Sequence, residues 1–231
     1  MSGPVLAIDT ALAQCAVCVL TGGRANVIAE PMTKGHAERL PLMVREGLSE
    51  AGVAARDLER VVATTGPGSF TGVRVGLAFA RGLGVGTETA VLGLSSLEAL
   101  AISAGAAAEG EAVAAVIDAK RGEVFLQTFD GETGAALAPP AAVATDAAPG
   151  SILREADGRA VRLVGSGTAL VAGALREAGA PFVESGVEAI DVRALAEAAR
   201  GRTPEPGGPR ALYVRAPDAT PPAPSPFAAR G

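Results

Sequence analysis

Residues Gly66–Gly84, GPGSFTGVRVGLAFARGLG, carry the strongest structural signal in the chain. They follow the apolar run Val61–Thr65, so the sequence predicts a strand, a tight glycine-rich turn and a helix over Thr71–Gly84. Because glycine inside a helix costs about 0.5–1 kcal/mol relative to alanine, we expect another backbone to pack closely against the small residues of this helix. That backbone comes either from the protein's own sheet, which we favour, or from a partner's helix. These small residues recur at every fourth position: Gly72, Gly76, Ala80 and Gly84. The side chains then expected to face outward are Val73, Leu77 and Arg81.

The region before this stretch reads as a strand meander followed by a helix. Short apolar runs at Val5–Ile8, Cys15–Leu20 and Ala25–Ala29 are separated by polar or glycine-containing turns. Apolar residues then recur at helical spacing over His36–Ala51, and Gly52 is placed to end the helix.

The cysteines Cys15 and Cys18 form a C-x-x-C string, which could indicate redox chemistry or half of a zinc site. On a strand, however, residues three apart point to opposite faces. We therefore interpret the two cysteines as small buried apolar side chains.

Downstream of the central stretch, Val91–Leu94 is predicted to be a strand. Ser95 and Glu98 fit a capping box that opens a helix over Ser96–Ala108, and Gly105–Gly110 is expected to link two lobes.

The second half repeats the first in outline, which predicts two related lobes. Val116-Ile117-Asp118 resembles the strand that ends at Asp9, and Leu163–Thr168 leads into a helix as the loop at Gly66 does. Asp191 is placed to cap a last helix. We assign residues 1–108 to the first lobe and 109–216 to the second, and we expect a disordered Pro-rich tail at 217–231.

Two aspartates and two glycine loops form a candidate nucleotide cleft. An Asp at the end of a buried strand either binds a metal-nucleotide or bonds to the N–H groups of its own turn. The loop at Gly66 either cradles a phosphate or is a rigid turn, and it matches neither G-x-x-x-x-G-K-[ST], nor G-x-G-x-x-G, nor G-x-S-x-G. The candidate cleft residues, whose binding role we interpret as vestigial, are Asp9, Thr10, Gly66, Gly68, Asp118, Gly165 and Gly167.

Composition limits the partners of the chain. Among 231 residues, 48% are hydrophobic, 3% are aromatic and the formal net charge is -5. No basic run could neutralise many phosphates, so the chain alone is not expected to be a platform for transfer RNA. Arg74 and Arg81 interrupt the apolar stretch from Val73 to Val85, and the start MSGPVLAIDT lacks the regions of a signal peptide. We expect a cytoplasmic protein with no membrane association.

Several strings, in this order and spacing, resemble the TsaB/YeaZ family, and GPGSFTGVR is the most specific of them. The others are LAIDT at Leu6–Thr10, GHAERLPLMV at Gly35–Val44, VIDAKRGEVF at Val116–Phe125 and LYVR at Leu212–Arg215. The resemblance implies an α/β protein with the two-lobed actin/hexokinase-like (ASKHA) fold, in which each lobe is a mixed sheet with flanking helices. It also implies a noncatalytic subunit that binds TsaD and supports transfer of threonylcarbamoyl to the adenosine next to the anticodon.

The resemblance further implies the other partners and the surface that binds them. TsaE, an ATPase subunit, joins the complex, transfer RNA is bound only indirectly through the complex, and the chain in isolation forms a homodimer. The helices at His36–Ala51 and Thr71–Gly84 resemble the elements that pack against TsaD or a second copy. The expected interface residues are Leu40, Met43, Val44, Val73, Leu77, Ala80 and Arg81.

The residues themselves argue against a catalytic role. Where TsaD has two metal-binding histidines in H-M-E-G-H, this chain has Ser96-Leu97-Glu98-Ala99-Leu100, and neither serine nor leucine replaces an imidazole ligand. The sole histidine, His36, is interpreted as a polar residue at a helix start. We expect no catalytic residue, no metal and no cofactor. The alternatives are a metal-independent peptidase, disfavoured by the single histidine, and a small-molecule kinase on the same fold.

Overall fold

The computed structural model describes residues 3–215, and its first half folds around a five-stranded mixed sheet of order β3-β2-β1-β4-β5. The meander predicted from the apolar runs forms its antiparallel part, and β4 and β5 add to it in parallel. The strands are β1 (Val5–Asp9), β2 (Gln14–Thr21), β3 (Arg24–Pro31), β4 (Arg60–Thr64) and β5 (Ala90–Leu94).

The second half forms another five-stranded sheet, of order β10-β9-β6-β7-β8. Reversed, this order repeats that of the first sheet strand for strand, so the internal repeat predicted from the sequence is confirmed in the topology. Its strands are β6 (Glu111–Lys120), β7 (Glu123–Asp130), β8 (Ala141–Ala144), β9 (Ala160–Val164) and β10 (Phe182–Glu184).

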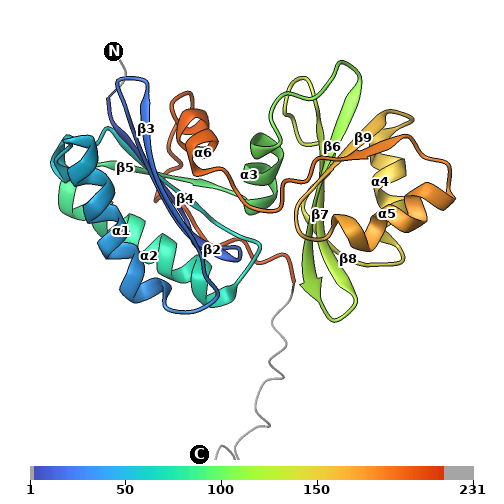
Figure 1. Ribbon diagram of the computed structural model, residues 1–231, viewed down its shortest axis with the longest axis horizontal. Helices are drawn as coiled ribbons and strands as arrows, with labels where there is room; N and C mark the ends of the chain where they lie inside the picture. Colours follow the sequence, from blue (N-terminus) through green and yellow to red (C-terminus); the bar gives the residue numbers. More distant parts are fainter. Residues whose placement is uncertain (1–2, 216–231) are drawn as a thin grey trace, which may run out of the picture.

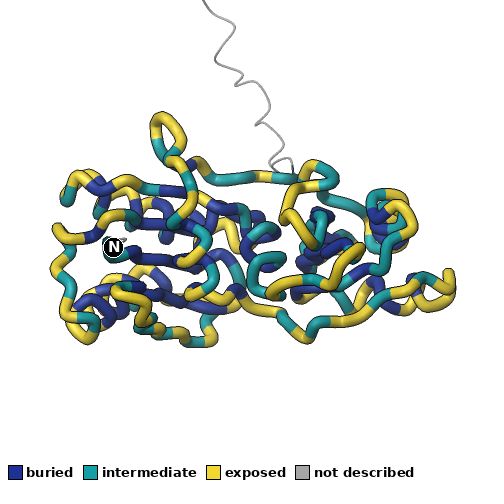
Figure 2. Tube along the Cα trace, turned by 90° about the horizontal axis from the view of Figure 1, so that it is seen from above, coloured by how far each residue is buried: buried dark blue, intermediate teal, exposed yellow. Residues whose placement is uncertain are grey.

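The helices divide the molecule into layers, as Figure 1 shows. α1 and α2 cover the outer face of the first sheet, α4 and α5 cover the outer face of the second, and α3 and α6 lie between the two sheets. Figure 2 shows the buried parts of the trace concentrated in these layers. The helices are α1 (His36–Ala51), α2 (Phe70–Thr87), α3 (Ser96–Ser103), α4 (Ala148–Ala156), α5 (Thr168–Glu177) and α6 (Val192–Ala199), with a 3-10 turn η1 at Ala55–Asp57. Within residues 3–215, no helix combines the length and apolarity needed to cross a membrane.

The third helix begins as predicted and ends earlier. The Ser95 hydroxyl accepts a hydrogen bond from the Glu98 N–H at 3.0 Å, which is the predicted N-terminal cap. The predicted end at Ala108 is wrong, because α3 stops at Ser103 and Gly105 follows with a left-handed φ of 73°. A glycine in this conformation ends a helix without steric strain.

The last helix returns to the first sheet. α6 begins at the Asp191 cap predicted from the sequence, whose carboxylate accepts from the Arg193 N–H at 2.8 Å, and it packs against β1 and β2. The division of the lobes at residue 108 stays a prediction. α6 lies within the range 109–216 predicted for the second lobe, but it packs against strands of the first sheet. The repeat could not show this return, because α6 follows the repeated elements. The tail at 217–231 lies outside the described residues.

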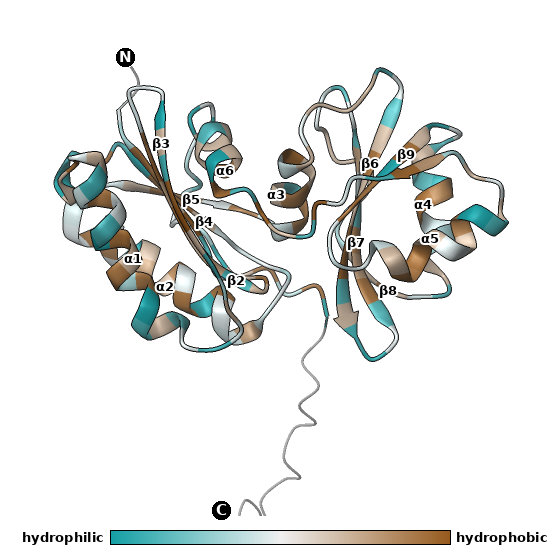
Figure 3. Ribbon diagram, in the orientation of Figure 1, coloured by the Kyte–Doolittle hydropathy of each residue, from teal (hydrophilic) through white to brown (hydrophobic). Residues whose placement is uncertain are grey.

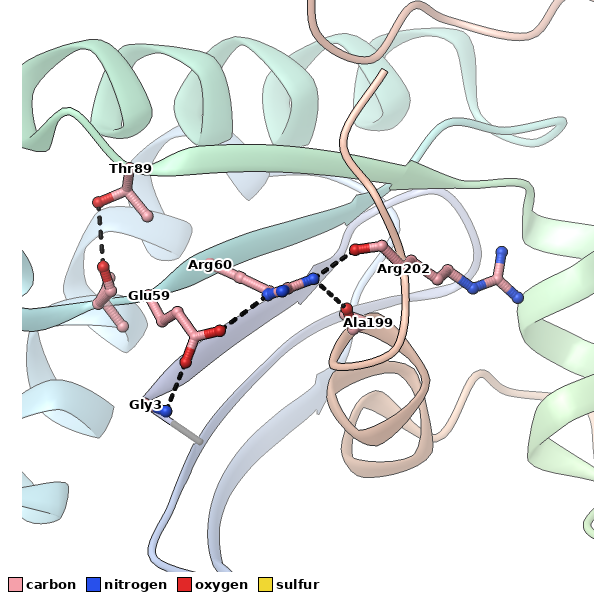
Figure 4. A network of polar contacts seen from close by, with 7 residues as sticks. Gly3, Glu59, Arg60, Thr89, Ala199 and Arg202 are labelled. Carbon is pink, nitrogen blue, oxygen red and sulfur yellow. Dashed lines mark hydrogen bonds and ion pairs between the residues drawn. The ribbon is translucent and has the colours of Figure 1, made fainter. Parts of the chain in front are cut away.

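One arginine ties α6 to the start of β4, as Figure 4 shows. The Arg60 guanidinium donates to the carbonyl oxygens of Ala199, at 3.1 Å, and of Arg202, near the C-terminal end of α6. Its Nε donates to Glu59 at 3.1 Å, and the Glu59 carboxylate accepts from the Gly3 N–H. A charged donor at a helix C-terminus satisfies carbonyls that the helix leaves without partners.

The two cysteines lie on opposite faces of β2, as predicted. Cys15 packs in the core under α1 and α2, whereas Cys18 packs in the central core between the sheets. Burial raises the pKa of each thiol to about 11, so the reactive thiolate is scarce at neutral pH.

We predict that Arg60→Ala lowers the free energy of unfolding by about 1–3 kcal/mol, because the carbonyl groups at the end of α6 lose their charged donor. Urea denaturation measures the change. The control is Arg56→Ala, at a side chain that is 86% exposed and lies 3.9 Å from its acidic partner, which we expect to change the free energy by less than about 0.5 kcal/mol. Equal effects of the two substitutions would contradict the role of Arg60 in tying α6 to β4.

Candidate functional site

The turn between β1 and β2 lies directly on the first turn of α2. The Ser69 N–H donates to the Ala11 carbonyl at 2.8 Å, and the Thr10 hydroxyl donates to the Gly72 carbonyl at 2.7 Å. A Cβ atom at Gly72 would lie 2.0 Å from the Thr10 carbonyl oxygen, and one at Gly68 would lie 2.2 Å from that of Ala11. Only glycine permits this approach of two backbones.

The close contact continues along the same face of α2. A Cβ atom at Gly76 would lie 2.4 Å from the Thr10 hydroxyl oxygen, and one at Gly84 would lie 2.3 Å from a Val91 methyl carbon on β5. The small-residue face therefore packs on the protein's own sheet, as the four-residue spacing predicted.

The expected interface residues are almost all in the protein's own core, so that prediction is wrong for them. They fill the space between the helices and the sheet, whose strands carry apolar colouring in Figure 3, and a partner cannot touch them. Sequence periodicity identified the apolar faces of the helices correctly but could not tell which neighbour covers them. The buried residues are Leu40, Met43, Val44, Val73, Leu77 and Ala80. Only Arg81 of the expected set is exposed.

A different set of small and apolar residues is exposed on these two helices. Val85 on α2 is 84% exposed and Leu42 on α1 is 45% exposed. Ala78, Gly82 and Val85 follow one another at the i, i+4, i+7 spacing of a single helix face, and a Cβ atom at Gly82 would meet nothing within 4 Å. We call Leu42, Ala78, Gly82 and Val85 the α1–α2 outer face.

Asp9 serves the turn that it begins. Its carboxylate is fully buried and accepts hydrogen bonds from the Ala11 N–H at 3.0 Å, the Gln14 side chain at 2.8 Å and the Thr64 hydroxyl at 2.8 Å. The pKa of Asp9 is raised above its usual value, because the effect of burial outweighs that of these hydrogen bonds, which lower it. Gln14 also donates to the Ile190 carbonyl at 2.9 Å, which joins the turn to the segment that precedes α6. The sequence held no sign of this role for Gln14.

A cleft of about 960 Å³ separates the two lobes beside this turn. Of the predicted cleft residues, Gly68 and Asp118 line it, whereas Asp9, Thr10, Gly66, Gly165 and Gly167 are buried and do not line it. The glycines of the second loop pack on β6 just as Gly68 packs on the first turn: a Cβ atom at Gly165 would lie 2.4 Å from the Val116 carbonyl oxygen, and one at Gly167 would lie 2.8 Å from a Val116 methyl carbon. The structure thus brings only part of the predicted set to one surface.

The wall of the cleft on the second lobe is charged and internally paired. Lys120 forms an ion pair with Asp118 at 2.6 Å, and the side chain and N–H of Lys120 lower the pKa of that carboxyl group. Arg215 donates to the Ala119 carbonyl at 3.2 Å and pairs with Glu123. Arg215 was not among the predicted site residues, although the LYVR string contains it.

Ser96–Leu100, the string that the resemblance matched to the TsaD metal site, lies at the central core. Ser96, Leu97 and Leu100 on α3 are fully buried, and the two leucines pack in the apolar core between the two sheets. His36 is 4% exposed, and its Nε2 lies 3.2 Å from the Gln14 carbonyl oxygen. In the described part of the chain, no three His, Cys, Asp or Glu side chains lie close enough to hold a metal ion.

Two sheets of the same strand order, joined through a central core beside a cleft, define a two-lobed protein of the actin-like fold class. A Bacteroides thetaiotaomicron protein titled as having an actin-like ATPase fold and unknown function matches with a TM-score of 0.50 and 11% identity, over 84% of this chain and 96% of that one. At this identity the match shows the fold alone.

Nearer relatives identify the family. A structure titled as an uncharacterized protein with similarity to peptidase YEAZ from Pseudomonas aeruginosa matches with a TM-score of 0.72 and 29% identity, over 93% of this chain and all of that one. The Escherichia coli (strain K12) tRNA threonylcarbamoyladenosine biosynthesis protein TsaB is 38% identical over 121 residues, which is 52% of each chain. A family model described as TsaD, tRNA N6-adenosine threonylcarbamoyltransferase, matches residues 20–185. The chain belongs to the TsaB/YeaZ family. Its aligned part spans about half the length of the curated relatives it matches.

We predict opposite effects for two glycine-to-alanine substitutions in α2. Gly72→Ala should lower the free energy of unfolding by about 1–3 kcal/mol, because its methyl group collides with the Thr10 carbonyl. Gly82→Ala has open space and should raise it by about 0.5–1 kcal/mol through helix propensity. Chemical denaturation of both variants measures the difference, and a stabilising Gly72→Ala would contradict the close backbone contact.

Proposed function

We propose that this chain is a noncatalytic subunit that binds TsaD and supports transfer of threonylcarbamoyl to the adenosine next to the anticodon of transfer RNA. Membership of the TsaB/YeaZ family, one curated relative of which is named for threonylcarbamoyladenosine biosynthesis, supports the pathway. The observation that carries the noncatalytic part is the burial of Ser96, Leu97 and Leu100 in the central layer. The two leucines pack in the apolar core between the sheets, at the string where the resemblance places the metal ligands of TsaD.

The turn at Asp9 supports the same proposal. The sequence made Asp9, with the loop before α2, part of a candidate nucleotide cleft. Here the Ser69 N–H is bonded to the Ala11 carbonyl, and both Asp9 oxygens accept hydrogen bonds from the protein. The donors and the carboxylate that would hold a metal-nucleotide are thus engaged within the chain.

The α1–α2 outer face supports the proposed partnership. Ala78 and Gly82 carry little or no side chain, and Leu42 and Val85 are exposed apolar residues. A helix pair on a partner can approach such a face closely and bury the exposed valine and leucine. We propose that TsaD covers this face in the complex and that a second copy of the chain covers it in isolation. TsaE joins through the assembled complex.

Transfer RNA is bound through the complex in this proposal. A formal net charge of -5 and scattered arginines supply little attraction for a polyanion. The chain acts in the cytoplasm, together with the transfer RNA that the complex modifies.

Depletion of this protein should reduce threonylcarbamoyladenosine in the transfer RNAs that carry it. The proposal makes the subunit necessary for efficient transfer, so nucleoside mass spectrometry of total transfer RNA should show the loss, and a plasmid copy of the gene should restore the modification. Normal levels in a complete deletion, in a host with no second copy of the gene, would contradict the proposed function.

Val85→Asp should abolish or strongly weaken association with TsaD while the chain stays folded. The side chain is 84% exposed, so a carboxylate there is solvated in the free subunit and loses its water only when the partner covers it. Size-exclusion chromatography with TsaD measures association, and circular dichroism measures folding.

The matched variant is Leu77→Asp on the same helix. Leu77 is 5% exposed, so this substitution should destabilise the chain itself by roughly 3–5 kcal/mol. A folded Val85→Asp variant that still co-elutes with TsaD and still self-associates would place the interface elsewhere.

A further inference from the structure

Two aromatic rings hold one arginine at the N-terminal end of α2. The Cζ atom of Arg74 lies 3.6 Å from the centre of the Phe70 ring, and its Nε donates to the Tyr213 hydroxyl at 2.9 Å. The rings of Phe70 and Tyr213 are themselves in contact, with centroids 5.7 Å apart. Tyr213 comes from the end of the described chain, so the cluster brings together two distant parts of the sequence.

Among residues 3–215, the positive charge of Arg74 has no carboxylate counterion. Within residues 3–215, the contacts of Arg74 are with Phe70 and Tyr213, and no carboxylate forms an ion pair with it. By contrast, Arg39 pairs with Glu30. Because Nε is bound to Tyr213, the two terminal nitrogens remain as a planar fork that suits a carboxylate.

The helix around Arg74 adds to this uncompensated charge. α2 is capped by the neutral Ser69 side chain and contains no acidic residue, in its first turn or elsewhere. The N-terminus of a helix carries a partial positive charge, which ordinarily favours acidic side chains and disfavours arginine. An anionic group on another molecule would therefore gain from both the guanidinium and the helix end.

The rings around the arginine are exposed in the subunit. Phe70 is 56% exposed and Tyr213 is 53% exposed. Tyrosine and arginine are enriched among the residues that dominate binding energy, and a rigidly held arginine loses little side-chain entropy when it binds. Covering the rings would also exclude water from the charge and strengthen its interaction with an anion.

We propose that Phe70, Arg74 and Tyr213 form a carboxylate-binding hot spot on the docking surface, which receives an aspartate or glutamate side chain of the protein partner. Arg74 binds the carboxylate through its two terminal nitrogens. Phe70 packs on the face of the guanidinium, and Tyr213 is a positioning residue that orients it. This inference rests on the proposed function, because the partner is the TsaD subunit that covers the outer side of α2.

A protein carboxylate fits this site better than a phosphate of RNA. The cluster holds one fixed cation, the chain carries a formal net charge of -5, and its lysines are only Lys34 and Lys120. RNA binding draws on many phosphate contacts at once, whereas one oriented arginine between aromatic rings suits a single acidic side chain.

The test is the dissociation constant for TsaD, measured by calorimetry over a series of salt concentrations. Arg74→Ala should weaken binding about tenfold or more and flatten its salt dependence. Arg74→Lys keeps the charge but not the planar fork, so it should restore the salt dependence without restoring full affinity. The control is Arg24→Ala, at an exposed arginine that begins β3, which should bind like the unmodified chain.

Tyr213→Phe separates positioning from packing, because it keeps the ring and removes only the hydroxyl that binds Nε. It should weaken binding about threefold in the unmodified chain and have no further effect in the Arg74→Ala background. Equal effects in both backgrounds would overturn the positioning role.

The outcomes distinguish this inference from the proposed function. If Val85→Asp disrupts binding while Arg74→Ala stays within twofold of the unmodified chain at every salt concentration, the hot spot is overturned and the proposed function stands. If the unmodified chain does not bind TsaD, both are overturned. If Arg74→Ala instead weakens a gel shift of transfer RNA and leaves TsaD binding unchanged, the anion is a phosphate and the protein carboxylate is overturned.

Discussion

The contact of the β1–β2 turn with the first turn of α2 governs the rest of the molecule. The carbonyl groups of Thr10 and Ala11 occupy the positions where side chains of Gly72 and Gly68 would otherwise lie. This approach brings α2 close to the first sheet, and the Ser69 N–H donates a hydrogen bond within the chain. The helix cost of several glycines is offset by packing that only glycine allows. One backbone contact thus explains why the Ser69 N–H in the loop before α2 already has a partner and why α2 lies so close to the β1–β2 turn.

The region between the two lobes is also filled by packed helices. α3 and α6 fill the region between the two sheets, and Arg60 ties α6 to β4 although α6 follows the whole second sheet in the sequence. Gln14 connects the β1–β2 turn to Ile190, just before α6. Asp9 and Gln14 of the β1–β2 turn are therefore part of the contacts that join the two lobes. The docking surface proposed for the first lobe is the outer side of α1 and α2 together with the neighbouring cluster around Arg74.

Local patterns predicted the elements of the first lobe and the repeat, because helical spacing, glycine stops and caps act over a few residues. They did not predict β8, α4 or β10. The caps at Ser95 and Asp191 and the glycine face of α2 are examples. The placement of side chains was harder to predict. Leu77 and Met43 were expected at an interface and lie in the core, because hydrophobicity indicates that a residue needs cover but not which surface provides it. The Phe70–Arg74–Tyr213 cluster depends on a contact between α2 and Tyr213 near the end of the described chain, which no local pattern could show.

The central claim is that this subunit supports threonylcarbamoyl transfer by binding TsaD and not by performing chemistry. Reconstituted transfer tests it most directly: purified TsaD, TsaE, unmodified transfer RNA and threonylcarbamoyl adenylate are combined with and without this chain, and the modified nucleoside is quantified. The account predicts product with all components, little without this chain, little with the Val85→Asp variant, and none when this chain replaces TsaD. Product formed by this chain in the absence of TsaD, or full activity of TsaD without this chain, would contradict the account.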